Sequence, residues 1–328
     1  MIEDFHHPHC NTILLIKKMV SIMDKDLLEM IEQAAKCLES DLDLSEKGLT
    51  ELPPALLSMS HLETLFLDEN QLTTIPKEIS QLSQLKHLDL SNNQLLYLPP
   101  EIAQLLELEE LYIETNQLAM LTPDIGKLSQ LKKLNLSENQ LIGLPHEFAQ
   151  LSLLKELDLS HNQLIAVPPE ILQLPKLKEL DLSGNPLTAV PPELFHLTQL
   201  KSLNLSNTQL KDLPSEFSSV SRLKELDISL NQLKILPSSL CQLTRLKELY
   251  LNENEIEVIP SQIAQLSRLE WLDMRDNYLS SLPSSLSQLS ELEWLFLEGN
   301  PLPIPSQILE LAEEPEDIIN NYMKTLNG

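Results

Sequence analysis

A repeat of 23 residues runs through most of this chain and limits what it can fold into. From residue 39 to residue 300 the pattern L-x-x-L-x-L-x-x-N-x-L-x-x-L-P-x-x-h-x-x-L, in which h is apolar, occurs in twelve copies, the last one incomplete. Its fourth position is leucine in every copy, from Leu42 to Leu295. So regular a spacing predicts a solenoid in which each repeat packs against its neighbours, and not two compact domains.

The spacing of the leucines predicts a short strand in each copy. The L-x-L pair alternates with a period of two, so its leucines point inward and the residues between and after them point outward. Asparagine follows at a fixed position in ten copies, and only Lys47 and Thr208 replace it. We expect these asparagines to be buried and to bond backbone groups of the turns, which would cost about 1–3 kcal/mol each if left unpaired.

A Leu-Pro pair closes most copies and restricts the segment that returns to the next strand. Proline fixes φ and lacks a backbone donor, so a long helix through Pro76, Pro99 or their equivalents is excluded. The convex side is therefore expected to be irregular or 3₁₀-like. Its inner side would be lined by Ile79, Phe148 and their equivalents.

The segment before the repeats is expected to close the N-terminal end of the solenoid. We expect residues 1–23 to be a flexible extension and residues 24–38 to be a capping helix, with Asp24 as its N-cap. The apolar residues at helical spacing in this segment are Leu27, Leu28, Met30, Ile31, Ala34, Ala35 and Leu38.

The segment after the repeats, residues 301–328, is expected to close the other end. Its first five residues include three prolines and break the pattern, and residues 316–326 follow with the spacing of an amphipathic helix. The apolar side of this helix would carry Ile318, Ile319, Tyr322 and Leu326.

With its leucine and asparagine positions, the repeat resembles that of the leucine-rich-repeat superfamily, in the 23-residue Leu-Pro subtype. This subtype is found in bacterial Roco proteins and in Ras-interacting leucine-rich-repeat scaffolds. The resemblance implies an α/β solenoid: a horseshoe with a concave parallel sheet of about twelve strands, a convex side without long helices, and helical N- and C-terminal caps.

Two flanking segments are similar to those of bacterial Roco proteins in particular. Leu27-Leu28-Glu29-Met30-Ile31-Glu32-Gln33-Ala34-Ala35 resembles the start of their repeat domains. Gly299-Asn300-Pro301-Leu302-Pro303-Ile304-Pro305, followed by Ile318-Ile319-Asn320-Asn321-Tyr322, resembles the stretch that joins their repeats to a GTPase. No GTPase follows this stretch before Gly328, so the nucleotide chemistry of that family is not carried over.

The net charge limits the kinds of partner to expect, and the cysteine content limits the cellular compartment. The formal net charge is −26, which would repel nucleic acid phosphates and anionic lipid headgroups, so we expect neither nucleic acid nor membrane as a partner. Cys10, Cys37 and Cys241 are odd in number and far apart, which favours reduced thiols and a cytoplasmic location. The only apolar run near the N-terminus, Ile13–Ile16, is too short for a signal peptide.

The residues and motifs of enzymes are missing from the pattern, so we expect no catalysis and no cofactor. None of the six glycines stands in a phosphate-binding loop, and no nucleophile elbow or metal-binding pair of histidines or cysteines occurs. Cys241 falls in a convex segment, where a buried thiol is the ordinary case. His6, His7, His9 and Cys10 have metal-ligand residue types but no second half to complete a site, so we expect no metal either.

The outward residues in the middle of the sheet form three rows. We expect a solvated surface in which lysines partly neutralise carboxylates, because exposed ion pairs stabilise little. The acidic track is Glu156, Asp158, Glu179, Asp181, Glu225 and Asp227. The hydroxyl row is Ser137, Ser160, Ser183, Ser206 and Ser229. The lysine row is Lys132, Lys155, Lys178, Lys201, Lys224 and Lys247.

Aromatic residues distinguish the C-terminal end of the same face. Both tryptophans of the chain, Trp271 and Trp294, occupy the same outward position in the last two copies. Since adjacent strands lie about 4.8 Å apart, one continuous patch is predicted, and large exposed apolar patches mark binding sites. The predicted partner-binding residues are Leu230, Tyr250, Trp271, Arg275, Trp294 and Phe296. Phe66 and Tyr112 form a thinner N-terminal pair.

These features favour a non-enzymatic scaffold that holds a protein or peptide on its concave face. Two other functions stay open: the sensor portion of a Roco-like GTPase system, and a bacterial effector that acts on host proteins. For the aromatic patch itself, the alternatives are a homodimer through it or coverage by the C-terminal cap helix.

Overall fold

The computed structural model describes residues 27–327. The N-cap expected at Asp24 and the histidine and cysteine residues between His6 and Cys10 lie outside this range.

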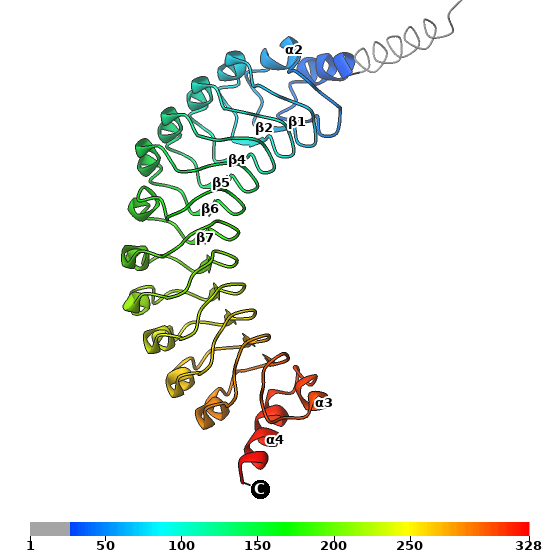
Figure 1. Cartoon of the computed structure of the whole chain (residues 1–328). Helices are drawn as coiled ribbons and strands as arrows, with labels where there is room; N and C mark the ends of the chain where they lie inside the picture. The colour runs from blue at the N-terminus through cyan, green and yellow to red at the C-terminus, as the bar shows by residue number, and fades with distance from the viewer. Residues whose placement is uncertain (1–26, 328) are drawn as a thin grey trace, which may run out of the picture.

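Twelve short parallel strands form one open sheet, in which each strand pairs with the next one along the chain (Figure 1). The register joins residues 23 positions apart, as in Asp41 with Thr64 and Trp271 with Trp294. The predicted α/β solenoid with a twelve-stranded parallel sheet is therefore confirmed. The strands are β1 (Asp41–Asp43), β2 (Thr64–Phe66), β3 (His87–Asp89), β4 (Glu110–Tyr112), β5 (Lys133–Asn135), β6 (Glu156–Asp158), β7 (Glu179–Asp181), β8 (Ser202–Asn204), β9 (Glu225–Asp227), β10 (Glu248–Tyr250), β11 (Trp271–Asp273) and β12 (Trp294–Phe296).

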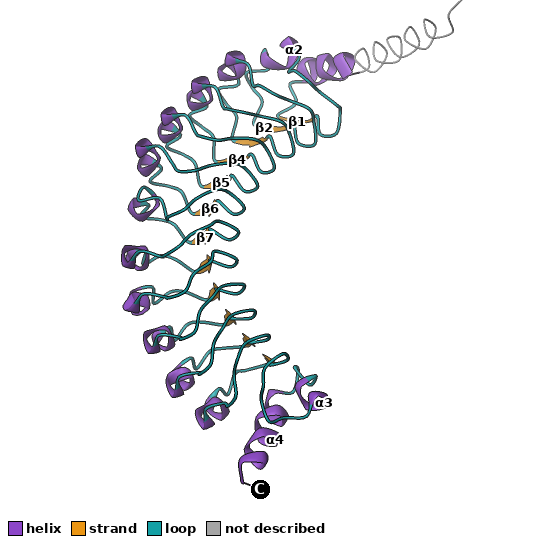
Figure 2. Ribbon diagram, viewed as in Figure 1, coloured by secondary structure: helices purple, strands orange, loops and turns teal. Residues whose placement is uncertain are grey.

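Short helices form the outer side of the solenoid, opposite the sheet (Figure 2). In η1 the proline before the helix is extended, with φ −70° and ψ 151° at Pro76, and Leu82 N donates to the carbonyl of Ile79 at 3.1 Å. The expected 3₁₀-like convex side is thus present, and α2 (Pro54–Leu57) takes its place in the first repeat. The 3₁₀-helices are η1 (Lys77–Gln81), η2 (Pro100–Gln104), η3 (Pro123–Lys127), η4 (His146–Gln150), η5 (Ile171–Gln173), η6 (Pro192–His196), η7 (Ser215–Ser219), η8 (Ser238–Gln242), η9 (Ser261–Gln265) and η10 (Ser284–Gln288).

The core is one continuous stack of leucines between the sheet and these helices. Leu65, Leu88 and Leu111, at the fourth position of successive copies, are fully buried. Ile79 and Phe148 close the stack from the convex side and are also fully buried. Burial of apolar surface along the whole length therefore holds each repeat to the next.

A ladder of buried asparagines runs beside the leucines, as predicted. Asn162 is 6% exposed, and its Nδ2 donates to the carbonyls of Leu136, Leu159 and Ser160 at 2.9–3.1 Å. Its Oδ1 accepts from Leu141 N at 2.9 Å. Each side chain thus joins two neighbouring coils. The same arrangement recurs at Asn70, Asn93, Asn116, Asn139, Asn185, Asn231, Asn254, Asn277 and Asn300.

Thr208 interrupts the ladder because its side chain is too short to reach the preceding coil. Its Oγ1 donates to the carbonyl of Leu205, in its own turn, at 2.6 Å. In the preceding coil Leu187 N, which an asparagine at position 208 would accept from, donates to the carbonyl of Asn185 at 2.8 Å. The turn therefore satisfies these groups locally, and only the side-chain connection between the two coils is lost, since the backbone bonds between β7 and β8 remain.

A helix over residues 27–37 covers the N-terminal end of the stack (Figure 1). Ile31 and Ala34 are buried, but Leu28, Met30 and Leu38 are 37–70% exposed. The apolar side predicted for this helix was therefore too wide, because only one face of so short an element contacts the first repeat.

Two helices close the C-terminal end: α3 (Ser306–Leu309), which the sequence did not predict, and α4 (Pro315–Asn327). Ile318, Ile319 and Tyr322 on α4 are buried as predicted, and Tyr322 Oη accepts from Leu282 N at 2.9 Å. The side chain of Leu326 is not described. Leu295 N of the last strand donates to the carbonyl of Ala312 at 2.9 Å, so the cap segment pairs with the exposed sheet edge.

Within residues 27–327, no helix combines the length and the apolar run that crossing a membrane requires.

Candidate functional site

Two rows of side chains face outward from the concave sheet, one from the first residue of each strand and one from the third. The middle residue of each strand is buried, as Leu157 of β6 and Leu272 of β11 are. Because every strand repeats the same backbone geometry, the side chains alone make one part of this face different from another.

Four aromatic rings pack together at the C-terminal end of the concave face, and we call them the aromatic cluster: Tyr250, Trp271, Trp294 and Phe296. The ring centroid of Trp271 lies 4.8 Å from that of Phe296, 5.3 Å from that of Trp294 and 6.1 Å from that of Tyr250. Trp294 and Phe296 are nearly parallel, with an interplanar angle of 8°. All four side chains stay partly exposed, so the aromatic part of the predicted patch is present.

The C-terminal cap leaves this cluster partly open to solvent. Helix α4 packs against η10, on the outer side of the last repeat, and bonds the backbone at Leu282. The alternative in which the cap helix buries the aromatic patch is therefore wrong.

Arg275 completes the cluster at its edge. Its Cζ lies 5.0 Å from the ring centroid of Phe296, in cation–π geometry, and its Nη2 pairs with Asp273 Oδ2 at 2.5 Å. Asp273 is only 2% exposed, so the guanidinium neutralises a buried carboxylate. Beneath the rings, the indole Nε1 of Trp271 is buried and has no acceptor among the described residues, which costs about 1–3 kcal/mol.

Leu230 does not lie on the strand surface with these rings, as the sequence interpretation assumed. It follows β9 in a turn, with φ 55°, at the left-handed position that other repeats fill with polar residues or glycine. Its side chain is 45% exposed. It is therefore an exposed apolar residue in the turn after β9 and does not lie on the strand surface that carries the rings.

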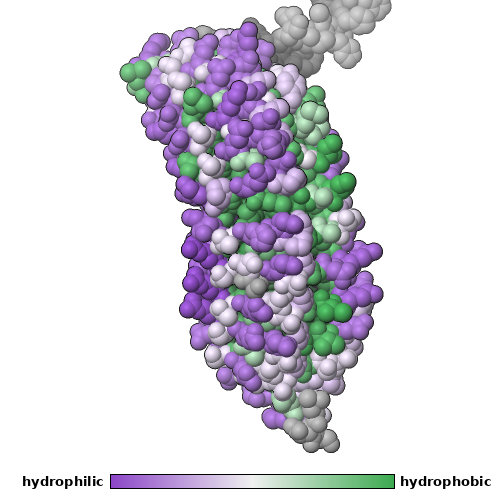
Figure 3. Space-filling view, turned by 90° about the vertical axis from the view of Figure 1, so that its left-hand side faces the viewer, coloured by the Kyte–Doolittle hydropathy of each residue, from purple (hydrophilic) through white to green (hydrophobic). Residues whose placement is uncertain are grey.

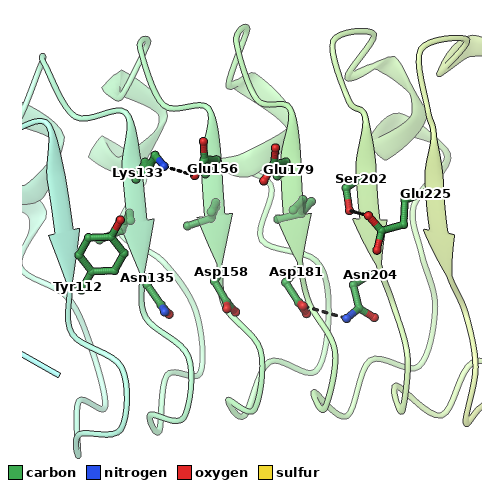
Figure 4. Close-up of a pocket in the computed structure, with 13 residues that line it drawn as sticks. Tyr112, Lys133, Asn135, Glu156, Asp158, Glu179, Asp181, Ser202, Asn204 and Glu225 are labelled. Atoms are coloured by element: carbon green, nitrogen blue, oxygen red, sulfur yellow. Dashed lines mark hydrogen bonds and ion pairs between the residues drawn. The ribbon is translucent and has the colours of Figure 1, made fainter. Parts of the chain in front are cut away.

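A hollow of about 300 Å³ lies in the middle of the concave face (Figure 4). The sequence interpretation of this region as an ordinary solvated surface missed the hollow, because the curvature of the sheet forms it and no single residue does. Figure 4 shows the acidic residues of β6 and β7 pointing into the same space. The polar and aromatic residues that line it are Tyr112, Lys133, Asn135, Glu156, Asp158, Glu179, Asp181, Ser202, Asn204 and Glu225.

The lysine row does not neutralise the acidic track. Lys132 pairs with Glu109 and Lys247 with Glu270, both outside the track, and no ion pair of the described residues involves the other four lysines of the row. The one pair on the track is Lys133 Nζ with Glu156 Oε2 at 3.0 Å. The prediction that these lysines neutralise the acidic track is therefore wrong. They stand one residue before their strands, and the two that form ion pairs do so with glutamates one residue before a neighbouring strand.

Burial and like charge raise the pKa of several track carboxyls. For Asp158 the main cause is desolvation, and Asp181 on the next strand adds to it, against hydrogen bonds from Ser160 that lower the pKa. The pKa of Asp227 is raised in the same way, by desolvation first. Desolvation also raises the pKa of Glu225. The middle of the face is therefore a negative surface on which, among the described residues, only Glu156 of the acidic track has an ion-pair partner.

The hydroxyl row is not on the open face. Its serines are 4–9% exposed and lie where the strand enters the turn. Ser183 N donates to Asp181 Oδ1 at 2.8 Å, and Ser183 Oγ donates to the same oxygen at 2.6 Å. Ser160, Ser183 and Ser229 therefore orient the carboxylates two residues before them, Ser137 and Ser206 orient Asn135 and Asn204 in the same way, and the row offers little surface to a partner.

The N-terminal aromatic pair includes a third ring that the sequence did not single out. The His87 ring lies 5.1 Å from Phe66 and 5.3 Å from Tyr112, and its Nδ1 is 3.1 Å from Glu110 Oε2. Burial raises the pKa of Tyr112 to about 12, with the nearby Glu110 as the next cause.

Several large apolar side chains outside the concave face are exposed, and Figure 3 shows hydrophobic patches along one edge of the solenoid. Leu96, Tyr97, Met120, Ile142 and Ile165 are 52–70% exposed. They occupy the two positions directly after the leucine that follows the ladder asparagine. Comparison of those positions across the repeats would have revealed them in the sequence.

Cys241 on η8 is 1% exposed, and burial raises the pKa of its thiol to about 11. It is therefore the buried, unreactive thiol that its position predicts. Within residues 27–327 no group of three or more histidine, cysteine, aspartate or glutamate side chains is arranged to hold a metal ion.

Family models agree with this architecture. A model described as "Leucine rich repeat" matches residues 40–95, 107–164, 175–233, 198–256 and 244–302, and one described as "Leucine Rich repeats (2 copies)" matches residues 152–196. The chain belongs to the leucine-rich-repeat family. A search of curated protein sequences gave no match.

Solved structures of leucine-rich-repeat proteins are similar to this chain over most of its length. The Leptospira interrogans LRR protein LIC12759 is 36% identical, with a TM-score of 0.79 over 85% of this chain and 78% of that one. A TDR receptor is 30% identical, with a TM-score of 0.73 over 83% of this chain and 49% of that one. The match from an octameric complex of Latrophilin 3, Unc5D and FLRT2 (LRR) is 27% identical, with a TM-score of 0.63 over 80% of this chain and 82% of that one.

Proposed function

We propose that this chain is a non-enzymatic binding module that holds a protein or peptide on its concave face through the aromatic cluster. The observation that carries the proposal is the position of four packed, partly exposed rings on the outward side of β10–β12. Aromatic side chains in an exposed patch with a charged rim are favoured anchors for partners. The complex of Latrophilin 3, Unc5D and FLRT2 is an example of a leucine-rich-repeat structure within a protein assembly.

The test compares the wild-type chain with a Trp271→Ala/Trp294→Ala variant as bait in a lysate of the source organism. Proteins recovered by the wild type are identified by mass spectrometry, and their affinities are then measured by calorimetry. The double variant should weaken binding by more than about 2 kcal/mol, or roughly thirtyfold, because both anchors are truncated. Lys178→Ala, on the same face but outside the cluster, should leave the affinity within about twofold.

Two controls keep this test decisive. Size-exclusion chromatography of wild type and variant shows whether the cluster joins two copies of this chain, since a homodimer would fall apart in the same variant. Circular dichroism shows whether the variant folds; if it does not, Trp294→Ala on the terminal strand replaces it. Full affinity in a folded variant would contradict the proposal.

The cytoplasm is the location that we propose, since both described cysteines are free, with Cys37 exposed and Cys241 buried. Reaction of Cys37 with a thiol reagent in freshly prepared cell extract would test this, because a thiol blocked as a disulfide would not react. Three interpretations stay predictions: the similarity to Roco repeat domains, the sensor role and the effector role.

A further inference from the structure

The aromatic cluster and the acidic track form one continuous strip along the concave face. Both occupy the first and third residues of their strands, and the carboxylates on β6, β7, β9 and β10, interrupted by Ser202 and Asn204 on β8, lead to the rings on β10–β12. No outward strand position from β6 to β12 holds a lysine or an arginine. A partner anchored on the rings would therefore extend over negative charge.

Three of the cations that border this strip are already paired, whereas Lys155, Lys178, Lys201 and Lys224, each one residue before β6–β9, form no ion pair among the described residues. Lys133 is bound to Glu156, Lys247 to Glu270 and Arg275 to Asp273. The described ion pairs include none for Asp158, Asp181 or Asp227, whose carboxylates are turned toward the open face and oriented by the turn that follows each strand. These carboxylates accept hydrogen bonds from the serines that follow them, and that of Asp181 also from Asn204 Nδ2, but no cation among the described residues pairs with them, so each can accept a cation from outside.

We infer that the segment bound to this face is a basic, extended stretch of a partner protein that runs across the strands from β6 to β12. Lysine or arginine side chains of this segment would lie over Asp158, Asp181 and Asp227, and an apolar or aromatic side chain next to them would pack on the aromatic cluster. This inference rests on the proposed function, because it assumes that the cluster is the anchor. Six steps of about 4.8 Å between strands correspond to about nine extended residues.

Charge complementarity selects this occupant over the others. An acidic partner, or a second copy of a chain with net charge −26, would bring further negative charge onto unpaired carboxylates. Burial already raises the pKa of Asp158 and Asp227, with neighbouring carboxylates as further causes, so a cation there relieves an existing repulsion. Arg275 over the Phe296 ring shows that the cluster itself accepts a cation on a ring face.

Two strands of the chain show which substitution removes charge from the acidic track without disturbing the fold. In β5 and β8 the corresponding residues are Asn135 and Asn204, and each Oδ1 accepts the backbone N–H two residues later, as the Oδ1 of Asp158 does. Asp158→Asn and Asp227→Asn should therefore keep this turn contact while losing two negative charges. The matched control is Glu107→Gln/Glu193→Gln, which removes the same charge from exposed positions outside the sheet.

The probe is a random library of peptides of about twelve residues, long enough to span the strip, displayed and selected against the full chain. Selected sequences are synthesised, and their binding is measured by calorimetry, because Trp271 and Trp294 are the only tryptophans and their double variant has no tryptophan emission to follow. We expect selected peptides to combine lysine or arginine with one large apolar residue. Asp158→Asn/Asp227→Asn should weaken them about tenfold and reduce the salt dependence of their affinity, while Glu107→Gln/Glu193→Gln changes affinity less than about twofold.

Each outcome has a definite meaning. Basic peptides that depend on both the tryptophans and the two aspartates support the inference. Peptides that lose affinity in Trp271→Ala/Trp294→Ala but carry no net positive charge would overturn it and leave the proposed function intact. Peptides that bind independently of the tryptophans, or a selection that enriches nothing, would overturn the inference and the proposed function together.

Discussion

The middle and the C-terminal end of the concave face have the same backbone and opposite surfaces. In β6 and β7 the outward positions hold Glu and Asp, whereas in β11 and β12 three of the four hold aromatic rings. The strand register, the buried leucines and the asparagine ladder beneath are the same in both regions. A leucine-rich repeat can therefore change its surface without changing its framework, because neither the buried leucines nor the asparagine ladder depends on the outward residues.

The largest effect that we expect is the loss of unfolding free energy when one ring of the aromatic cluster is removed. Phe296→Ala removes ring contacts with Trp271 and Trp294 and the cation–π contact with Arg275. Because these groups are partly exposed, we expect the free energy of unfolding to fall by about 2–3 kcal/mol. Urea unfolding followed by circular dichroism measures it. The corresponding change in the middle, Asp158→Asn, should cost nothing, and an equal cost at both places would contradict the comparison.

The asparagine ladder offers a second test. Loss of a ladder asparagine should lower the free energy of unfolding equally in the middle and at the C-terminal end. Asn162→Ala and Asn277→Ala each leave three backbone carbonyls and one backbone N–H without the side-chain partner. Each variant should lose about 1–3 kcal/mol of unfolding free energy. Thermal unfolding of the two variants side by side gives the comparison. An unchanged melting temperature in either would show that solvent satisfies these groups.

A smaller effect on stability is expected when the pH changes, and only from the carboxylates in the middle of the concave face. A carboxyl whose pKa is raised in the folded state stabilises the fold below its unfolded pKa and loses that contribution as pH rises through its folded pKa. Asp158 faces Asp181 and His161, and Asp227 faces Asp181 and Asp273, with desolvation as the main cause of both raised values. Lowering the pH from about 7 toward the ordinary aspartate pKa of about 4 should therefore increase stability, by less than about 1 kcal/mol for these partly buried groups. Asp158→Asn/Asp227→Asn should reduce this gain, and urea midpoints at both pH values would measure it.

The smallest effect is expected for the lysine row. Lys178 forms no ion pair among the described residues, so Lys178→Ala should change the free energy of unfolding by less than about 0.5 kcal/mol. The matched change at a paired lysine, Lys133→Ala, should cost about 0.2–1 kcal/mol through loss of Glu156. Equal costs for the two lysines would mean that Lys178 also compensates the track.

The sequence placed the outward side chains correctly within the strands and incorrectly just beyond them. Tyr250, Trp271, Trp294 and Phe296 were predicted to meet, and they do. Leu230 was assigned to the same surface, but the chain has already entered a left-handed turn there. A period-of-two argument holds only while the backbone stays extended.

The sequence by itself determined the solenoid, the strand positions, the buried asparagines and the aromatic cluster. All of these follow from one repeat, because a fixed spacing of 23 residues places equivalent side chains in equivalent surroundings in every copy. Only the tertiary structure decided which charges are paired, how deeply Asp158 and Ser183 are buried, and where the sheet curves into a hollow. The physical reason is that these properties depend on distances between side chains of neighbouring coils and on the small rotation from one coil to the next. A one-dimensional pattern specifies neither.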